Sequence, residues 1–338
     1  MATPIWFEGF EDQSMDYLTS AGWVFEDGVV LTGSNRHLDF AGNGGLKCLV
    51  TSDSDTVNLP TWLPGTGARW MTFYMMFQSL GSDRFFTFQR GGTNTWTVGI
   101  EAGYVTLRRG GSTSTLVTSS ISPVVANVGH LWEIELLAQD VTGTCKVYVD
   151  KDTTPIVSFT GDTKSHTSLN DWNGGAIVAT SFGSTFAYWD DFVVSDTRLS
   201  DEPYVIRLPP TSDYSIQSTG SLGGTGSFSL VDELPPTSSD YNQFPLNTRD
   251  LYGHDPLSFT PTSIAAIKVV GDVARDGTVT AIQFAVMSSG SEFFAVSQSI
   301  AGSGQYAMQE SYWAVDPFTS SSWTVSGVND TKFGAKFV

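Results

Sequence analysis

Basic side chains are scarce in this sequence. Its 338 residues include 17 Lys and Arg against 35 Asp and Glu, which gives a formal net charge of −18 at pH 7. Such a chain repels phosphate backbones and anionic lipid instead of gathering them. Long apolar runs are also missing, and no basic residue precedes Arg36. We therefore expect no nucleic-acid partner, no membrane insertion, and folding in a cytosol.

Cysteine and histidine are equally few. The cysteines, Cys48 and Cys145, cannot form a disulfide framework, and in a reducing compartment we expect both to be small buried hydrophobic residues. The four histidines lie far apart without His-x-His or His-x-x-x-His spacing. Phosphate-binding glycine loops, Gly-x-Ser-x-Gly and Asp-x-Asp-x-Asp-Gly are absent as well. The sequence thus predicts no metal site and no cofactor.

Short strands and turns are what the sequence is rich in. Ser and Thr number 78 and Gly 34, while charged residues make up only 15% of the chain. Apolar residues alternate with period two, and turn-forming residues interrupt them roughly every 8 to 12 positions. This pattern predicts an all-β protein. Hairpins are expected where 132–136 and 145–150 flank a turn, and where Ala102-Gly103 reverses the chain.

The length and one change of texture predict two domains. At roughly 100 to 200 residues per domain, the chain has room for about two. The stretch 195–203 is polar and ends in a proline that cannot join a central strand. We predict a large two-sheet sandwich over 1–198 and a smaller β-sandwich over 199–338, entered through a long loop rich in Ser, Gly and Pro. A fragment ending near Thr197 is expected to fold alone.

Several short motifs carry a family resemblance. Residues 132–136 and 147–150, with 9–11 near the start and 188–194 near the end of the first domain, resemble the concanavalin A-like lectin/glucanase jelly roll of laminin-G type. In that family the first and last strands pair as neighbours. The resemblance implies a jelly-roll sandwich for residues 1–198.

Motifs in the second half resemble a different group. They are similar to the second half of bacteriophage virion proteins that carry such a lectin-like domain in front, and they lie at 205–211, 231–233, 240–241, 249–252 and 316–338. The resemblance implies a structural protein of a tailed-phage virion, at the tail tip, baseplate or collar. The alternative is a capsid decoration or head-fibre protein. Other virion proteins and further copies of the chain are the implied partners.

Two glutamates test whether the chain could be a glucanase. Glu133 and Glu135 are two apart on a predicted strand, so their side chains share one face, as a pair of catalytic carboxylates requires. The glucanases that this fold resembles carry a third acid, and here Leu137 and Ala138 follow instead. Lys146 and Lys151, across the hairpin, could pair with these glutamates. We expect a solvent-facing pair, no catalytic residue and no enzymatic activity.

Asp190 and Asp191 raise the question of calcium. Laminin-G-type domains often bind calcium at a rim, and hard cations prefer oxygen ligands. Adjacent strand residues point to opposite faces, so at most one of the two side chains could join a single site. The expected arrangement is one buried aspartate bonded to loop amides and the other on the surface.

Ten tryptophans are the chain's other notable feature. Those in alternating strands are expected in the core: Trp70, Trp132 and Trp189. Those in turn-rich polar segments are expected to contact another virion subunit or a glycan, because exposed aromatics serve both purposes: Trp62, Trp96 and Trp172. A glycan-binding or glycan-cleaving host-recognition module, with host-surface polysaccharide as its partner, is therefore the rival function.

The C-terminal strand is the predicted attachment point to the virion. Residues 331–338 read as an edge strand with only Lys332 and Lys336 to blunt it. Its apolar side chains, those of Phe333, Phe337 and Val338, straddle both faces. One set is expected to enter the core and the other to be left for a neighbouring protein.

Overall fold

A computed structural model describes most of the chain. The described residues are 4–9, 24–25, 30–32, 48–51, 56–60, 67–77, 80, 82–90, 93–110, 115–164, 172, 174–178, 187–220, 225–232, 239–275, 279–300, 302, 304 and 306–338. They form two compact units, 1–206 and 207–338. The first unit therefore extends past the boundary that the sequence indicates. None of the described helices is long and apolar enough to span a bilayer.

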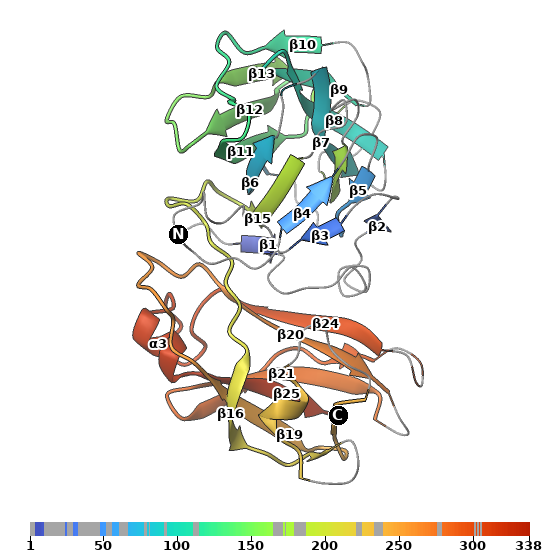
Figure 1. Cartoon of the computed structure of the whole chain (residues 1–338), viewed down its shortest axis with the longest axis vertical. Helices are drawn as coiled ribbons and strands as arrows, with labels where there is room; N and C mark the ends of the chain where they lie inside the picture. Colours follow the sequence, from blue (N-terminus) through green and yellow to red (C-terminus); the bar gives the residue numbers. More distant parts are fainter. Residues whose placement is uncertain are drawn as a thin grey trace. The chain divides into compact units, whose positions relative to one another are not determined.

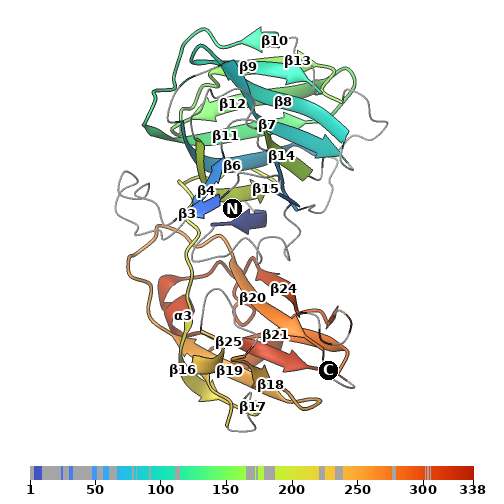
Figure 2. The ribbon, with the colours of Figure 1, turned by 45° about the vertical axis from the view of Figure 1, so that its right-hand side comes forward.

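The first unit consists of two antiparallel sheets (Figures 1 and 2). Sheet A contains, in spatial order, β13 (Val157–Gly161), β12 (Gly143–Val149), β11 (Gly129–Leu137), β6 (Arg69–Phe77), β15 (Ala187–Ser195), β4 (Cys48–Thr51) and β3 (Val30–Thr32), with β1 (Pro4–Glu8) also paired to β15. Sheet B contains β10 (Thr115–Thr118), β9 (Tyr104–Arg109), β8 (Thr93–Glu101), β7 (Ser82–Arg90), β14 (Gly174–Val178), β5 (Thr56–Asn58) and β2 (Val24–Phe25). The first and last strands of the unit are thus neighbours.

Local turn chemistry sets the register of the predicted hairpins. Strand β11 pairs with β12 so that Trp132 lies opposite Val149. Strands β8 and β9 are joined by Ala102 and Gly103, whose φ angles of 52° and 85° are both positive. Two positive φ values give the tight turn whose twist matches that of paired strands. Both hairpins are confirmed.

Aromatic rings fill the space between the two sheets. Phe73 of sheet A lies 5.8 Å from Phe86 of sheet B, and Phe85 of sheet B lies 4.9 Å from Trp132 of sheet A. Trp132 and Trp189 are fully buried, as the alternation predicts. Ring pairs at these distances add to the area they remove from water. The first unit is a jelly-roll sandwich, and the expected fold class is confirmed.

The second unit is a smaller β-sandwich. Its main sheet, sheet C, contains β16 (Pro210–Ser215), β19 (Arg249–His254), β25 (Lys332–Phe337), β21 (Ala281–Ser288) and β22 (Ser291–Phe294), with β23 (Gln298–Ser299) also on β21. A ribbon of β20 (Ile267–Ala274) and β24 (Tyr306–Trp313) packs on it, and β17 (Thr219–Gly220) pairs with β18 (Asn242–Gln243). Two short helical turns are η1 (Phe228–Leu230) and α3 (Val325–Asp330).

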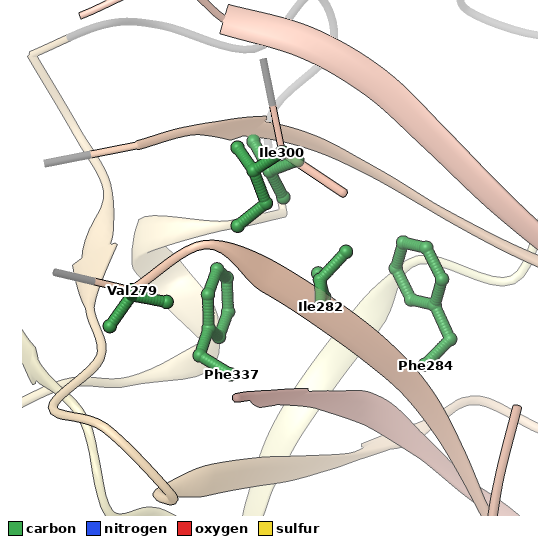
Figure 3. Packing of buried hydrophobic residues seen from close by; sticks show 6 residues of the cluster. Val279, Ile282, Phe284, Ile300 and Phe337 are labelled. Atoms are coloured by element: carbon green, nitrogen blue, oxygen red, sulfur yellow. The ribbon is translucent and has the colours of Figure 1, made fainter. Parts of the chain in front are cut away.

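The terminal strand β25 corrects one prediction. It lies between β19 and β21 and is paired on both sides, so it is a central strand of sheet C and not an edge. Phe337 is 8% exposed, lies in the cluster drawn in Figure 3 beside Val279 and Ile300, and stacks on Phe244 at 4.3 Å. A strand late in the chain can still be inserted between earlier ones, and sequence position does not reveal this.

Helix α3 begins after Thr324, whose hydroxyl accepts a hydrogen bond from the Gly327 amide at 3.0 Å. Threonine at this position satisfies an amide that the first helical turn leaves unpaired. The capped turn buries Val328 against Val286 and Trp323 in a second core cluster.

Candidate functional site

Charged and aromatic side chains gather on the outer face of sheet A. Strand β11 directs Trp132 and Ile134 into the core, which leaves Glu133 and Glu135 on the opposite face. Strand pairing sets Glu133 beside Tyr148 of β12. On its other side Glu133 lies opposite Thr72 of β6, and Glu135 lies opposite Trp70.

Glu133 is fully buried and held by two cations. The Arg198 guanidinium donates to both carboxylate oxygens, through Nε at 3.2 Å and Nη2 at 2.6 Å. The Lys151 ammonium lies 2.9 Å from Oε1 and also donates to the Leu199 carbonyl at 3.0 Å. The hydrogen bond to Glu133 raises the pKa of Arg198 above its ordinary value, against the opposing effect of burial. A buried carboxylate needs such pairing, because desolvating an uncompensated charge is very costly.

Glu135 and Arg198 complete the arrangement. Lys146 donates to Glu135 at 2.8 Å, and this bond raises the pKa of the lysine. The Arg198 guanidinium lies over the Tyr148 ring at 4.2 Å and near Trp70 at 5.7 Å. A guanidinium on aromatic faces gains cation–π attraction while it keeps its hydrogen bonds.

Of the predictions about this face, the lysine pairs are confirmed and the solvent exposure of Glu133 is wrong. Both predicted lysine pairs are present, Lys146 with Glu135 and Lys151 with Glu133. The expected solvent exposure is wrong for Glu133, because residues after β15 fold back across the face. Arg198 was missed; its only sequence signal is a lone basic residue in the polar stretch that follows the closing strand.

The strap, residues 196–206, is the segment that covers this face. Arg198 reaches Glu133 from it, and Leu199 is 9% exposed. Further along, the Val205 amide donates to Asp191 at 2.9 Å. These contacts make the strap part of the first unit.

Asp190 and Asp191 are both buried, at 0% and 3% exposed. The register of β15 against β6 shifts between Asp190 and Val193, and Asp191 has a φ of 51°. A bulge inserts an extra residue and breaks the strict alternation of faces. The expectation that one of these aspartates lies on the surface is therefore wrong. The hydrogen bond from the Val205 amide satisfies Asp191 in its buried position. Among the described residues, no group of three or more metal-ligating side chains occurs.

Two of the three predicted contact tryptophans, Trp96 and Trp172, are buried. Trp96 is 0% exposed and lies 5.0 Å from the Phe159 ring, and Trp172 is 1% exposed and lies 4.7 Å from Phe88. Both predictions of exposure are wrong, because burying a large apolar ring in the core stabilises the fold more than leaving it exposed in a polar turn. Trp62 lies outside the described residues. Trp70, expected in the core, is only half-buried, on the outer face.

Two scarce residue types take structural roles where they are described. Cys145 is fully buried, as predicted, and burial raises the pKa of its thiol far above the ordinary value. His130 lies 2.7 Å from Asp150 across the β11–β12 hairpin. His254 is 3.1 Å from the Val328 carbonyl. His37 and His166 lie outside the described residues, as does the side chain of Cys48.

The outer face of sheet B is polar, and beside Thr97 of β8 it carries Arg108 of β9. Hydroxyls of Thr87 and Thr97 are 3.1 Å apart, and Thr97 also donates to the Gly110 carbonyl at 2.6 Å. Gln89 donates to Asn58 at 3.4 Å and to Asn94 at 3.1 Å. The Thr87 and Thr97 side chains are buried, whereas those of Gln89, Asn58 and Asn94 are partly exposed. Of these groups, only the amides can offer donors and acceptors to a neutral polar ligand.

Asp250 is the centre of the largest buried polar network in the described part of the second unit. It is 0% exposed and accepts from the amides of Gln217 at 2.7 Å and Ser218 at 2.9 Å. The Ser218 hydroxyl and the Tyr252 hydroxyl donate to its other oxygen, the latter at 2.7 Å. Burial, and then the charge of Asp250, raise the pKa of Tyr252.

The predicted attachment residues lie on the strand at the centre of sheet C. Phe333 is half-buried and packs against the second core cluster, with the His254 ring 5.1 Å away. Phe337 is in the first cluster. The Val338 amide donates to the Ala281 carbonyl at 2.9 Å, which ties the last residue to β21. Their expected role in attachment stays a prediction, now without the free edge on which it was based.

Comparison with known proteins gives structural likenesses only. No family model and no curated protein sequence matches the chain. The cellulose induced protein Cip1 superposes with a TM-score of 0.37 at 14% identity, over 53% of this chain and 94% of that one. Domain 4 of the arabinanase AbnA from Geobacillus stearothermophilus gives 0.39 at 14% identity, over 57% and 92%.

A carbohydrate esterase of the Shiga toxin-encoding bacteriophage phi24B is also similar. It superposes with a TM-score of 0.38 at 13% identity, over 58% of this chain and 99% of that one. All three scores are below 0.5. The fold assignment therefore rests on the strand order and pairings described above.

Proposed function

We propose that this chain is a non-enzymatic structural component of a tailed-phage virion, located in the tail at its tip, baseplate or collar. A position on the capsid, as a decoration or head-fibre protein, is the alternative. In either place the chain would contact other virion proteins and further copies of itself.

The observation that carries the proposal is the role of the motif residues that resemble virion proteins. Arg207 donates to the Asp232 carbonyl at 2.8 Å, which joins two of those motifs. Asp250 and Tyr252, from a third, form the buried network around Ser218. These polar side chains form hydrogen bonds within the second unit and so stabilise its fold. Because the motif residues bond to the protein itself and not to a ligand, they favour a structural role over a ligand-binding one.

The absence of catalysis is supported by the state of the two glutamates. A retaining or inverting glycosidase needs one carboxylic acid that donates a proton and one carboxylate free to act on the sugar or on water. Glu133 is buried beneath Arg198 and bonded to two cations, and Glu135 is bonded to Lys146. Neither carboxylate is therefore free to act on a sugar or on water.

Localisation in the particle tests the virion role. Antibodies against the purified chain should label intact tailed particles of the phage whose genome encodes this sequence, at one defined position by electron microscopy. Labelling of the head instead of the tail would select the alternative. Particles that lack the chain altogether would refute both.

Turnover tests the absence of catalysis. Incubation of the purified chain with β-glucans or host polysaccharide should release no reducing ends above buffer. Release that the Glu133→Gln variant loses, and that the Lys146→Ala variant keeps, would show the chain to be an enzyme.

Adhesion to a host-surface polysaccharide is a second candidate, favoured by the partly exposed amide groups of Asn58, Gln89 and Asn94 on the outer face of sheet B. If this face binds glycan, Gln89→Ala should weaken retention of the chain on host polysaccharide. Ser158→Ala, on the exposed edge of sheet A, is the matched control and should change nothing. Equal retention of both variants and the unmodified chain would exclude this face.

A further inference from the structure

Strand β10 is an unprotected edge of the first unit. It ends sheet B in the described part of the chain and pairs only with β9. Its sequence is Thr-Leu-Val-Thr, without charge or proline. Edges of sheet C are different, because β16 contains Pro210 and Asp213 and β22 contains Glu292. Charge and proline are the usual means by which soluble proteins block edge-to-edge pairing.

The segment around β10 is the longest charge-free run in the chain. Residues 110–129 contain no Asp, Glu, Lys or Arg, in a protein of net charge −18. On the neighbouring strands, Arg108 and Glu101 lie 4.0 Å apart and offset each other. Two copies of so acidic a chain repel over most of their surfaces. They can approach closely where the charge is absent.

Exposed apolar side chains accompany this edge. Leu116 on β10 is 42% exposed, and the loop that follows adds Ile121 at 56%, Val125 at 55% and Val128 at 43%. A hydrogen bond from the Ser122 hydroxyl to the Gly103 carbonyl, at 2.8 Å, fixes this loop beside the β8–β9 turn. The apolar groups are thus presented on an ordered frame and not on a free loop.

The backbone of β10 has pairing capacity left. The Ser119 amide donates to the Val105 carbonyl at 2.8 Å, and Val117 lies opposite Leu107. In an antiparallel ladder the N–H and C=O groups of successive residues point alternately to one neighbour and to the other. The backbone groups of Thr118 therefore point away from β9, toward the open edge.

We infer that β10 pairs with β10 of a second copy of this chain, antiparallel and across a two-fold axis. Identical strands that meet in this way form a closed, self-complementary contact, so association stops at a dimer. The pairing extends sheet B through both copies and covers Leu116 and Ile121. This inference goes beyond the proposed virion role and does not depend on it.

The dimer is expected to be weak in solution. Ordering the contact costs translational and rotational freedom, and a four-residue strand contributes few hydrogen bonds. Sedimentation velocity of the full chain should show a monomer that converts to a dimer as concentration is raised. In hydrogen exchange, the Thr118 amide should become protected with the same concentration dependence.

Two variants and one control test the assignment. Leu116→Lys puts a charge in the contact and should raise the dimer dissociation constant by about tenfold or more, a factor that corresponds to ~1.4 kcal/mol. Thr118→Pro removes the outward N–H and should weaken the dimer similarly while it leaves the β9–β10 pairing intact. Val141→Lys is the control, because Val141 is 77% exposed in the same unit and lies in the β11–β12 turn.

The outcomes separate cleanly. Weakening by either edge variant, with an unchanged melting temperature and an unaffected Val141→Lys control, supports the β10 contact. A chain that stays monomeric at every concentration overturns the inference. So does a dimer that neither edge variant weakens, since another surface must then hold it, or one that the control weakens equally.

Discussion

Both units of the molecule contain fully buried carboxylates, and two of these, Glu133 and Asp250, are stabilised by different means. Glu133 in the first unit is neutralised by the cations Arg198 and Lys151. Asp250 in the second is surrounded by neutral donors, the amides of Gln217 and Ser218 and two hydroxyls. In both units the carboxylate fastens a loop segment to a strand. A segment can therefore be fastened through a buried acid either by cations or by neutral donors.

The largest expected effect comes from removing the strap. A fragment of residues 1–206 should melt cooperatively, whereas one of residues 1–197 lacks Arg198 and leaves Glu133 with a single cation. Breaking a buried ion pair typically costs ~3–5 kcal/mol, and the lost contacts of Leu199 and Val205 add to it. We therefore expect the shorter fragment to show no cooperative transition, contrary to the expectation from sequence.

Tryptophan fluorescence during thermal melting measures this, since eight of the ten tryptophans lie in the first unit. If the two fragments melt alike, the strap contributes nothing to the first unit and the boundary near 198 stands.

A point substitution tests how much the cations around Glu133 contribute to stability. Arg198→Ala in the full chain should destabilise the first unit by ~3–5 kcal/mol, because the buried Glu133 carboxylate loses its bidentate partner. Lys146→Ala is the matched control: its partner Glu135 is partly exposed, and such pairs contribute only ~0–1 kcal/mol. Urea unfolding followed by fluorescence would distinguish the two. Similar losses in both variants would mean that burial of Glu133 is unimportant.

Disturbing the neutral donors around Asp250 is expected to give a smaller loss of stability. Asp250→Asn keeps the shape but replaces one acceptor oxygen with an amino group that faces donors. Hydrogen bonds to charged groups contribute ~1.5–3 kcal/mol each, so we expect a loss of about that size in the second unit. Circular dichroism during urea unfolding measures it. Tyr252→Phe, which removes one donor and leaves the rest, should cost less; the reverse order would contradict the proposed network.

The smallest effects concern two further aspartates of the second unit with opposite pKa shifts. Burial raises the pKa of Asp272 above its ordinary 3.8, and its Oδ1 is buried without a hydrogen-bond partner. A raised acid pKa favours folding below the unfolded value and loses that contribution as pH rises through the folded value. Asp272→Asn should therefore stabilise the second unit at pH 7, by at most ~1 kcal/mol because the group is only half-buried. The gain should vanish near pH 3.

Asp316 should behave in the opposite way. Burial opposes its ionisation, but hydrogen bonds from Ser288, Phe318 and Thr319 prevail and lower its pKa. A lowered acid pKa stabilises the fold above the unfolded value, and the contribution is lost as pH falls through the folded value. Asp316→Asn should destabilise at pH 7 and have little effect at low pH. Melting temperatures of both variants across this pH range check the pair, and parallel pH profiles would refute the assignment.

Parts of the candidate site were readable from sequence. Alternation put Glu133 and Glu135 on one face, and the short turn after β11 brought Lys146 opposite Glu135, because a hairpin's register follows from its turn. Arg198 was not readable, since 65 residues separate it from Glu133 and no local pattern links them. The bulge that buries Asp191 was hidden for a similar reason: it depends on the partner strand β6.

What the sequence determined by itself is what depends on near neighbours: the all-β class, the hairpins, the faces on which the glutamates lie, and an acidic surface with one long neutral stretch at 110–129. The tertiary structure alone decided which faces are covered. In it Trp96 and Trp172 are buried, and the strap covers Glu133. Strand β25 lies at the centre of sheet C, and β10 lies at an edge of sheet B. Backbone alternation is a local steric property, whereas the choice of a neighbouring strand minimises the free energy of the whole unit, so that residues distant in sequence decide it together.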